Sequence, residues 1–263
     1  MPYFLQILLL AESKSAKALT LLLIKSLTAD SKLFMDKEYA KYLLDKTKND
    51  YNLIAEDFSR TREKIWEETR FLFDNYLKED NKVLDLGCGT GRYAELFKDR
   101  KIEYIGADIA EEQIRIARKK HPEAKFQTID FLNFPFSDNH FDKIYSIAVF
   151  HCIPSKEYRI KFLKEVKRIL KKDGLLILTV WKSKRWNVSL LFKYTILKLI
   201  GKSKLDFRDF LEPWADKTER YYHWFSKREL SEIVKKAGFK IKETGVIKNK
   251  TGNRQNIYLV AKK

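Results

Sequence analysis

Three glycines at alternate positions, with carboxylates on either side, have the spacing of a ligand-binding loop. The apolar run KVLDLGCGTGR stops at Gly87, Gly89 and Gly91. Glycine takes backbone dihedrals that other residues avoid, and it lets a ligand lie against the main chain. Asp85 precedes the glycines, and Asp108 follows them by about twenty residues, where a carboxylate can accept both hydroxyls of a ribose. The pattern indicates a nucleoside cofactor, whereas the alternative is a tight strand-to-helix turn that binds nothing.

This stretch resembles motif I of the class I S-adenosylmethionine-dependent methyltransferases, D-x-G-x-G-x-G, and differs from the G-x-G-x-x-G of dinucleotide-binding loops. The resemblance covers about residues 82–180 and implies S-adenosyl-L-methionine as the cofactor. Its expected contacts are Asp85, Gly87, Cys88, Gly89, Gly91, Asp108, Ile109, Asp130 and Phe131. Asp85 would meet the amino-acid end of the cofactor, Asp108 the ribose and Asp130 the adenine amino group, with Ile109 and Phe131 enclosing the adenine. A helix or turn cap is the alternative role for Asp130.

A histidine follows the fourth predicted strand, in the loop that normally faces the transferring methyl group. The segment SIAVFHCIP carries His151 and Cys152. It resembles the S-I-A-V-x-H segment of the wobble-uridine tRNA methyltransferases, including the methyltransferase domain of the AlkB-homologue type. A second histidine usually follows in that family, and Cys152 stands in its place here. A buried structural histidine is the alternative interpretation of His151.

A second match to this family lies downstream. The segments FLEPW and RYYHWF, followed by SKREL, look like the family's V-P-W and R-Y-Y-H-x-F signature, and the earlier FSRTR looks like its F-S-x-T-R. The resemblance implies that the acceptor is the carboxylate of a carboxymethyl group on uridine. The residues expected to orient it are His151, Arg220, Tyr221 and His223, with Arg60 and Arg62 as secondary candidates. A carboxylate is already ionised at neutral pH, so no strong base is needed. An aromatic plug over the core is the alternative for RYYHWF.

Alternating strands and helices must position these residues. Apolar runs predict strands over residues 82–86, 103–108, 125–129, 143–147 and 175–180. Helical patterns lie between them over residues 93–99, 111–120 and 156–170. Two further strands, over residues 239–246 and 256–261, form a terminal hairpin. We therefore expect an α/β fold, a Rossmann-like class I methyltransferase with a seven-stranded sheet, helices on both faces and a terminal antiparallel hairpin.

The composition favours a polyanionic partner. Lys and Arg number 53 against 36 Asp and Glu, which gives a formal net charge of +17, and 44% hydrophobic residues can supply the core of one α/β domain. The excess of positive charge favours nucleic acid or an anionic membrane surface, with a lysine-rich proteome as the alternative. Two cysteines and four histidines show no disulfide framework and no metal-ligand spacing. We expect a cytoplasmic protein without a metal.

We expect three parts in the chain: an apolar N-terminal segment of unclear role over residues 1–34, a helical cap over 35–80 and the methyltransferase domain over 81–263. The two apolar runs of the first segment are shorter than a membrane-spanning helix requires. A docked or membrane-surface helix pair is one interpretation. The other is a start-site artefact, in which the functional chain begins at Met35.

A basic insertion interrupts the methyltransferase domain at about residues 182–224, and its centre, residues 188–200, is an apolar helix with basic residues along it. Such a helix could lie on an anionic membrane, form a lid or bind tRNA phosphates. Peripheral membrane contact through residues 1–34 or 188–200 therefore stays open.

The leading hypothesis is a tRNA methyltransferase that esterifies a carboxymethyl group on a wobble uridine. A small-molecule or lipid methyltransferase is the first alternative, because the N-terminal segment and residues 188–200 are apolar. A non-catalytic RNA-binding protein that keeps the fold is the second. The family resemblance also implies a small zinc-binding activator subunit as a partner.

Overall fold

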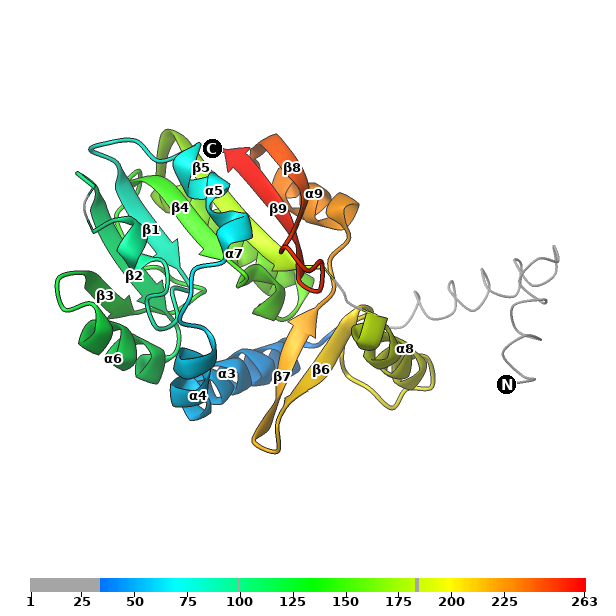
Figure 1. The fold of residues 1–263 in the computed structure, drawn as a ribbon. Coiled ribbons are helices and arrows are strands. Elements are labelled where there is room, and N and C mark those ends of the chain that lie inside the picture. The colour runs from blue at the N-terminus through cyan, green and yellow to red at the C-terminus, as the bar shows by residue number, and fades with distance from the viewer. Residues whose placement is uncertain (1–33, 99, 183–184) are drawn as a thin grey trace.

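A seven-stranded sheet forms the centre of the part of the chain that the computed structural model describes, which is residues 34–98, 100–182 and 185–263, with the backbone alone for 185–188. The expectations for residues 1–33 lie outside this part. The strands are β1 (Lys82–Leu86), β2 (Glu103–Asp108), β3 (Lys125–Thr128), β4 (Phe141–Ile147), β5 (Leu170–Trp181), β8 (Lys240–Lys248) and β9 (Gln255–Lys262). Their order is β3-β2-β1-β4-β5-β9-β8 (Figure 1). Strands β1 to β5 are parallel and β9 is antiparallel to both neighbours, which confirms the predicted terminal hairpin.

Helices cover both faces of the sheet, because successive strand side chains point to opposite sides and both sides are apolar. On β4, Ile144 packs into a core shared with α7 (Lys156–Ile169) and α9 (Lys227–Lys236). Its neighbour Tyr145 packs into a second core, with α5 (Phe71–Asp74) and α6 (Glu111–Lys120). The two cores confirm the Rossmann-like arrangement.

Local capping defines where several helices begin. The Asp36 side chain accepts a hydrogen bond from Tyr39 N at 2.7 Å and starts α3 (Lys37–Leu53). Ser226 accepts one from Glu229 N at 3.1 Å and starts α9. A side-chain oxygen at this position satisfies an amide that has no partner inside the helix.

Residues 93–98, the described part of the helix predicted over 93–99, do not form an α-helix. A 3-10 turn spans Ala94–Leu96, and Phe97 N bonds Ala94 O, three residues back, at 3.0 Å. Tyr93, Leu96 and Phe97 are all buried in one core, so the chain winds more tightly than an amphipathic α-helix would.

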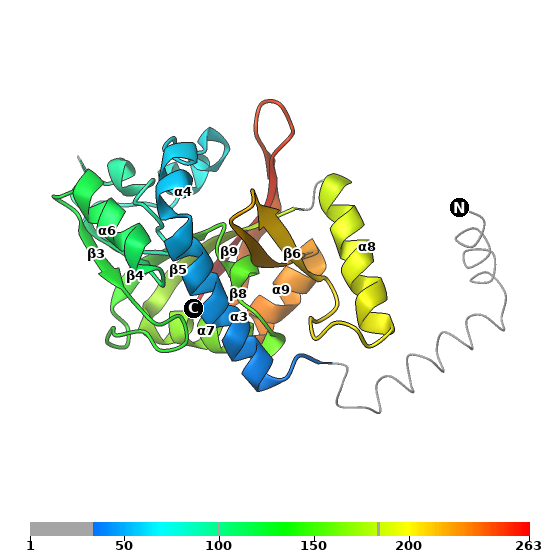
Figure 2. The ribbon, with the colours of Figure 1, turned by 90° about the horizontal axis from the view of Figure 1, so that it is seen from below.

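The segment before the sheet and the insertion after β5 meet at the carboxyl ends of the strands. Helices α3 and α4 (Ala55–Thr61) lie across this end (Figure 1). The insertion forms α8 (Arg185–Leu199) and a separate antiparallel hairpin of β6 (Asp209–Trp214) and β7 (Thr218–His223). This hairpin lies between α3 and α8 (Figure 2). The carboxyl-terminal end of the sheet is therefore covered by elements that precede β1 in sequence and by elements that follow β5.

Candidate active site

The glycine loop has the backbone conformation that the sequence predicts. Gly87 and Gly89 have φ of 82° and 56°, in the left-handed region that favours glycine. A Cβ on Gly87 would lie 2.2 Å from Val149 Cγ2, so no larger residue fits there. A Cβ on Gly89 would lie 3.6 Å from Gln113 Oε1 and 3.7 Å from Phe58 Cε1, which is ordinary contact distance. The main chain at Gly89 is therefore accessible to a ligand. The loop therefore packs closely on one side and is accessible on the other.

Two buried carboxylates lie at this loop. Asp108 accepts hydrogen bonds from Gly89 N and Ala110 N, both at 2.9 Å, and so fixes the loop to the end of β2. Tyr104 donates its hydroxyl hydrogen to Asp85 Oδ2 at 3.2 Å. Burial raises the pKa of Asp85 to about 7, because a charge is poorly solvated there and the hydrogen bond from Tyr104 compensates only in part. Burial also raises the pKa of Asp108.

A first cavity opens over the loop. Seven of the nine expected cofactor residues line it: Asp85, Gly87, Cys88, Gly89, Asp108, Ile109 and Phe131. Thr47, Tyr51 and Phe58 close it from α3 and α4. The cavity thus combines an accessible main chain, two carboxylates and apolar side chains, and these groups fit S-adenosylmethionine, which has an ammonium, a ribose and a planar adenine.

The other two expected cofactor residues lie outside this cavity. Gly91 packs instead on His121 and Phe126. Asp130 is exposed, and its Oδ1 accepts a hydrogen bond from Leu132 N at 2.7 Å. This contact is the turn cap that was the alternative role for Asp130, so its adenine contact stays a prediction.

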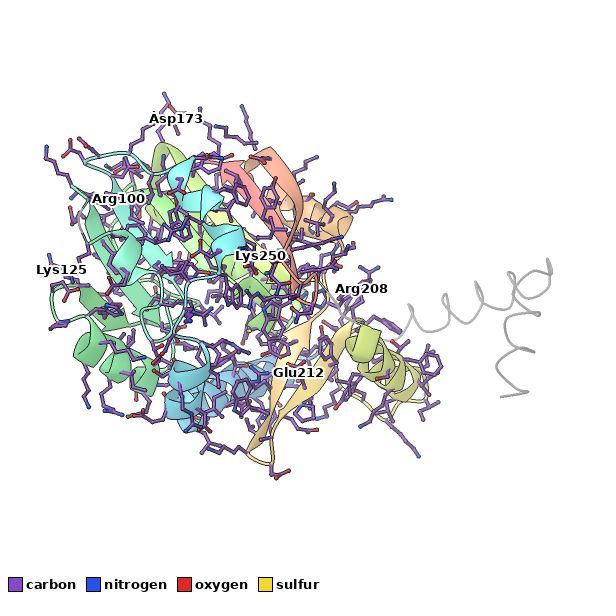
Figure 3. The ribbon with its side chains drawn as sticks, viewed as in Figure 1. Arg100, Lys125, Asp173, Arg208, Glu212 and Lys250 are labelled. Carbon is purple, nitrogen blue, oxygen red and sulfur yellow. The ribbon has the colours of Figure 1, made fainter. Side chains whose placement is uncertain are left out.

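A second cavity of about 420 Å³ adjoins the first, and Arg62, Trp66 and Trp181 line both. The β6–β7 hairpin supplies much of its wall through Phe210, Glu212, Trp214, Arg220 and Tyr222. Figure 3 labels Glu212 on this hairpin, below the sheet. Side chains from residues 253–255, just before and at the start of β9, complete the wall. A molecule in the second cavity would therefore lie next to one in the first.

Arg220 is held in the second cavity by charge and by aromatic rings. Its Nη2 donates to Glu212 Oε2 at 2.9 Å, and both side chains are buried. The guanidinium carbon lies 4.3 Å from the centre of the Trp214 ring and 5.1 Å from that of Tyr222. The buried Nε has no hydrogen-bond partner. Arg220 therefore has a fixed orientation, and its Nε–H is available to donate a hydrogen bond to a ligand.

His151 is buried between two aromatic rings at the wall of the second cavity. Its ring lies 5.0 Å from Trp181 and 5.3 Å from Tyr222, centre to centre, and neither ring nitrogen has a hydrogen-bond partner. Burial, together with the charge of Arg220 and of His223, lowers the pKa of His151 to about 3. The imidazole is therefore neutral at physiological pH and can donate one hydrogen bond.

Tyr221 and His223 make contacts other than the expected acceptor contacts. Tyr221 packs with Met35, Leu43 and Leu205, outside both cavities, because alternate residues of β7 point to opposite sides. His223 lies at the edge of the second cavity, but Nδ1 is 2.6 Å from Asp209 Oδ1 and Nε2 is 2.9 Å from Glu229 Oε1. Both ring nitrogens are thus engaged by carboxylates. The acceptor roles of Tyr221 and His223 remain predictions without support from this geometry.

The two secondary arginines differ in position. Arg60 is exposed and paired with Asp57 at 3.0 Å, away from both cavities. Arg62 lines both cavities, with its guanidinium carbon 5.7 Å from the centre of the Trp214 ring. Of the pair, Arg62 is the one placed to meet a ligand anion.

Sequence reasoning missed Trp181 and Arg254. Trp181 is the last residue of β5. Arg254 forms a bidentate ion pair with Glu68, 186 residues away in sequence, through Nε to Oε1 at 2.6 Å and Nη2 to Oε2 at 3.1 Å. No local pattern signals a contact of that separation. Among the described residues no group of His, Cys, Asp and Glu could hold a metal ion.

Comparison with known proteins agrees with this geometry. A family described as "Methyltransferase domain" matches residues 84–178. A solved SAM-dependent methyltransferase of Methanosarcina mazei is 27% identical, with a TM-score of 0.63 over 73% of this chain and 96% of that one. The fold and the loop define a class I methyltransferase whose cofactor is S-adenosylmethionine.

Two relatives place the chain more narrowly. A putative methyltransferase of Encephalitozoon cuniculi is 32% identical over 74% of this chain and 87% of its own length. The tRNA (carboxymethyluridine(34)-5-O)-methyltransferase of Schizosaccharomyces pombe is 30% identical over 81% of this chain and 94% of its own. The chain belongs to the family of the tRNA (carboxymethyluridine(34)-5-O)-methyltransferases. It spans about a third (33%) of the longer human relative, probable tRNA methyltransferase 9B, at 34% identity.

Proposed function

We propose that this methyltransferase esterifies the carboxylate of a carboxymethyl group on a wobble uridine of tRNA. The observation that carries the proposal is the second cavity, where a buried arginine with an Nε–H available to a ligand lies between aromatic rings beside the cofactor cavity. Arginine suits a planar carboxylate, and tryptophan faces suit a nucleic-acid base. The S. pombe relative is named for this reaction.

The cofactor residues act by holding the donor in place. S-adenosylmethionine, when bound, supplies a methyl group on a positively charged sulfur. Asp108 would accept the ribose hydroxyls, Asp85 the ammonium, and Arg62 the carboxylate of the methionine end. Ile109 and Phe131 would enclose the adenine. These roles follow from the chemistry of the residues that line the first cavity.

The acceptor needs orientation rather than activation. In the transfer, a carboxylate oxygen forms a bond to the methyl carbon while the carbon–sulfur bond breaks and its electron pair stays on sulfur. The acceptor is already an anion near neutral pH, so no proton has to be removed. Arg220 would bond the oxygen that does not attack, which preserves the nucleophilicity of the other. Neutral His151 would donate one further hydrogen bond without adding charge.

Methyl transfer from labelled S-adenosylmethionine to tRNA that carries carboxymethyluridine tests the proposal, with unmodified tRNA and a lipid extract beside it. We expect label in the carboxymethylated tRNA alone. Label in the lipid extract would favour a lipid methyltransferase, and cofactor binding and tRNA binding without transfer to any substrate would favour a non-catalytic RNA-binding protein.

The side chain of Arg220 supplies a sharper variant. Arg220→Lys keeps the charge beside Glu212 but loses the planar fork, so we expect kcat/KM to fall about a hundredfold with unchanged cofactor affinity. Arg228→Lys, at an exposed pair with Glu232 on α9, is the matched control. Equal activity of the two variants would contradict the role of Arg220.

We also propose that an activator subunit joins this chain and that the pair works in the cytoplasm. A methyltransferase solved in complex with the Trm112 activator of Haloferax volcanii has the same fold, at 18% identity and a TM-score of 0.57. Both cysteines are free and buried, as suits a reducing compartment. Adding a Trm112-type subunit to the transfer assay should raise the rate, and co-purification of the two proteins would support the pairing.

A further inference from the structure

Helix α8 has one face packed on the molecule. Leu190, Leu191 and Tyr194 pack against the cluster of Phe210 and Tyr222 on the β6–β7 hairpin. Both views place α8 at the periphery, next to β6 (Figures 1 and 2). The helix therefore covers the outer side of the hairpin and has its own outer side turned away from the core.

The outer side of α8 and of the residue after it is apolar as well. Its large side chains recur at helical spacing and are well exposed: Phe192 (52%), Ile196 (41%), Leu199 (48%) and Ile200 (57%). Residues spaced by four, three and one form a single stripe along a helix. We call these four residues the α8 stripe. A helix that is apolar on both sides is normally buried on both.

The segment of sequence that carries the α8 stripe is basic. Between β5 and Leu205 the sequence contains no Asp or Glu but seven basic residues: Lys182, Lys184, Arg185, Lys193, Lys198, Lys202 and Lys204. Lys193, Lys202 and Lys204 are exposed. The charge of Lys198 acts on the carboxylate of Asp206, and Lys193 and Lys204 lie over the rings of Tyr194 and Tyr39, at 5.3 Å and 5.5 Å from the ring centres. The stripe thus combines exposed apolar area with neighbouring lysines.

The N-terminal segment joins the fold beside this region. Met35 N donates to Asp206 Oδ1 at 2.6 Å, and Met35 packs with Leu205, shortly after α8. The sequence before Met35 has two apolar runs, at 4–11 and 18–27, and four lysines, Lys14, Lys17, Lys25 and Lys32, with two acidic residues, Glu12 and Asp30. The described chain therefore begins, at residues 34–35, beside the residues that follow α8.

We propose that the α8 stripe is a docking surface for an anionic lipid membrane. Aliphatic side chains enter the boundary between headgroups and acyl chains, while lysines pair with anionic headgroups. RNA fits less well, because three of the four side chains of the stripe, Ile196, Leu199 and Ile200, are aliphatic and offer no hydrogen bond to a phosphate and no ring to a base. A second copy fits less well, because a symmetric contact would bring the lysines of both copies together. Among the described residues no helix has the length and apolarity to cross a membrane, so the contact is peripheral.

Flotation of the full chain with vesicles tests this surface. Vesicles of phosphatidylcholine with a fifth to a third of phosphatidylserine should carry the protein to the top of the gradient, and phosphatidylcholine alone should carry much less. The double variant Ile196→Glu and Ile200→Glu should lower the fraction bound about tenfold or more, because it places two anions in the apolar face. Val246→Glu, at a residue of similar exposure (40%) on β8, is the matched control and should bind like the wild type.

Other outcomes would overturn the proposal. Wild-type protein that stays at the bottom of the gradient contradicts it, and so does a double variant that floats as well as the wild type, which would assign binding to another segment. A wild-type dimer that the double variant converts to a monomer, without flotation of either, would assign the stripe to a second copy. Reduced tRNA affinity in the double variant, again without flotation, would assign it to RNA. Methyl transfer by the double variant should equal that of the wild type, so this test is separate from that of the proposed function.

Discussion

At the scale of single residues, Asp85 links cofactor binding to pH. Burial raises its pKa to about 7, so the carboxyl is largely protonated below that pH when the cavity is empty. An ammonium binds the ionised form, and the proton must then leave. We predict that S-adenosylmethionine binds about eightfold more tightly at pH 7.5 than at pH 6, as the ionised fractions at a pKa of about 7 require. Calorimetric titration of the wild type and of Asp85→Asn measures this, and the variant should bind weakly with no such slope.

The same shift affects stability with the opposite sign. Because the folded pKa lies above the ordinary value of about 4, the folded protein holds the extra proton, and stability from this group is lost as the pH rises from about 4 to 7. Bound cofactor should remove much of this loss. A wild type whose cofactor affinity is flat from pH 6 to 7.5 would contradict the contact between Asp85 and the ammonium.

His223 is predicted to position the acceptor site rather than to touch the acceptor. It joins Asp209, the first residue of β6, to Glu229 on α9, and Arg159 lies 3.8 Å from the same Asp209 oxygen. Burial raises the pKa of Glu229, but hydrogen bonds from His223 and Arg208 outweigh it and lower that pKa to about 2. His223→Gln removes a hydrogen-bond partner from buried Asp209 and from half-buried Glu229, so we expect a loss of about 1–3 kcal/mol in the free energy of unfolding.

Urea unfolding measures this loss, and the double variant His223→Gln with Glu229→Gln should recover part of it, because one of the two carboxylates is then neutral. If His223→Gln costs no more than an exposed substitution, the positioning role is wrong. A loss of methyl transfer with undiminished stability would instead restore the acceptor role for His223.

At the scale of elements, the glycine loop has no room for a larger residue at Gly87. Gly87→Ala adds a Cβ 2.2 Å from Val149 at a φ of 82°. Gly201→Ala has a similar φ of 72° but nothing within 4 Å. Both substitutions carry the left-handed penalty of about 1–2 kcal/mol, and only the first displaces the wall of the cofactor cavity. We predict that Gly87→Ala abolishes measurable cofactor binding while Gly201→Ala binds normally, as titration calorimetry would show. Normal binding by both variants would contradict the close packing of the loop.

Elements with local signals could be predicted from the sequence. Strands β1 and β2 have the predicted bounds, because each is an apolar run that ends at glycine or at a carboxylate. Helix α6 also matches, from Glu111 to Lys120. The ends of strands are harder to predict where pairing with another strand decides them. Strand β5 begins at Leu170 instead of residue 175, because Leu170 pairs with Phe141 on β4.

Long-range contacts set the limit for the site. The expected cofactor residues follow their strands directly, and the carboxyl ends of parallel strands meet at one edge, so seven of the nine line the first cavity. The second cavity depends on the β6–β7 hairpin, for which the sequence has no clear turn motif, and on Arg254, which is far from the hairpin in sequence. Arg220 and Tyr221 are neighbours on β7, so their side chains point to opposite sides, one into the second cavity and the other into the core. The sequence did not predict this strand.

At the scale of the whole molecule, the net charge of +17 predicts how tRNA binding depends on salt. Each neutralised phosphate releases a counterion, so four contacts would weaken binding about a hundredfold between about 50 and 200 mM salt. Lys182 is exposed at the rim of the second cavity, and Lys182→Ala should make the log–log slope shallower by about 1. Filter binding across a salt series measures both effects. An affinity that does not change with salt would contradict phosphate contacts.

We propose that the parts of the chain work as a cap, a catalytic sheet and an insertion. Residues 35–80 would form the cap, because α3 and α4 close the cofactor cavity with Thr47, Tyr51 and Phe58. The insertion at about residues 182–224 would carry the acceptor wall on one side and the α8 stripe on the other. This arrangement separates recognition of the substrate from attachment to a surface.

In the proposed reaction the methyl group is transferred to a carboxylate oxygen of the tRNA. The chemical stability of the product tests this most directly. After transfer from methyl-labelled S-adenosylmethionine, the tRNA is treated with mild alkali, which hydrolyses a methyl ester to methanol but leaves methyl groups on ring carbon, ring nitrogen or ribose in place. We predict that the label is released as volatile methanol. Label that stays on the nucleosides after alkali would show that this chain methylates a different atom and would contradict the proposed function.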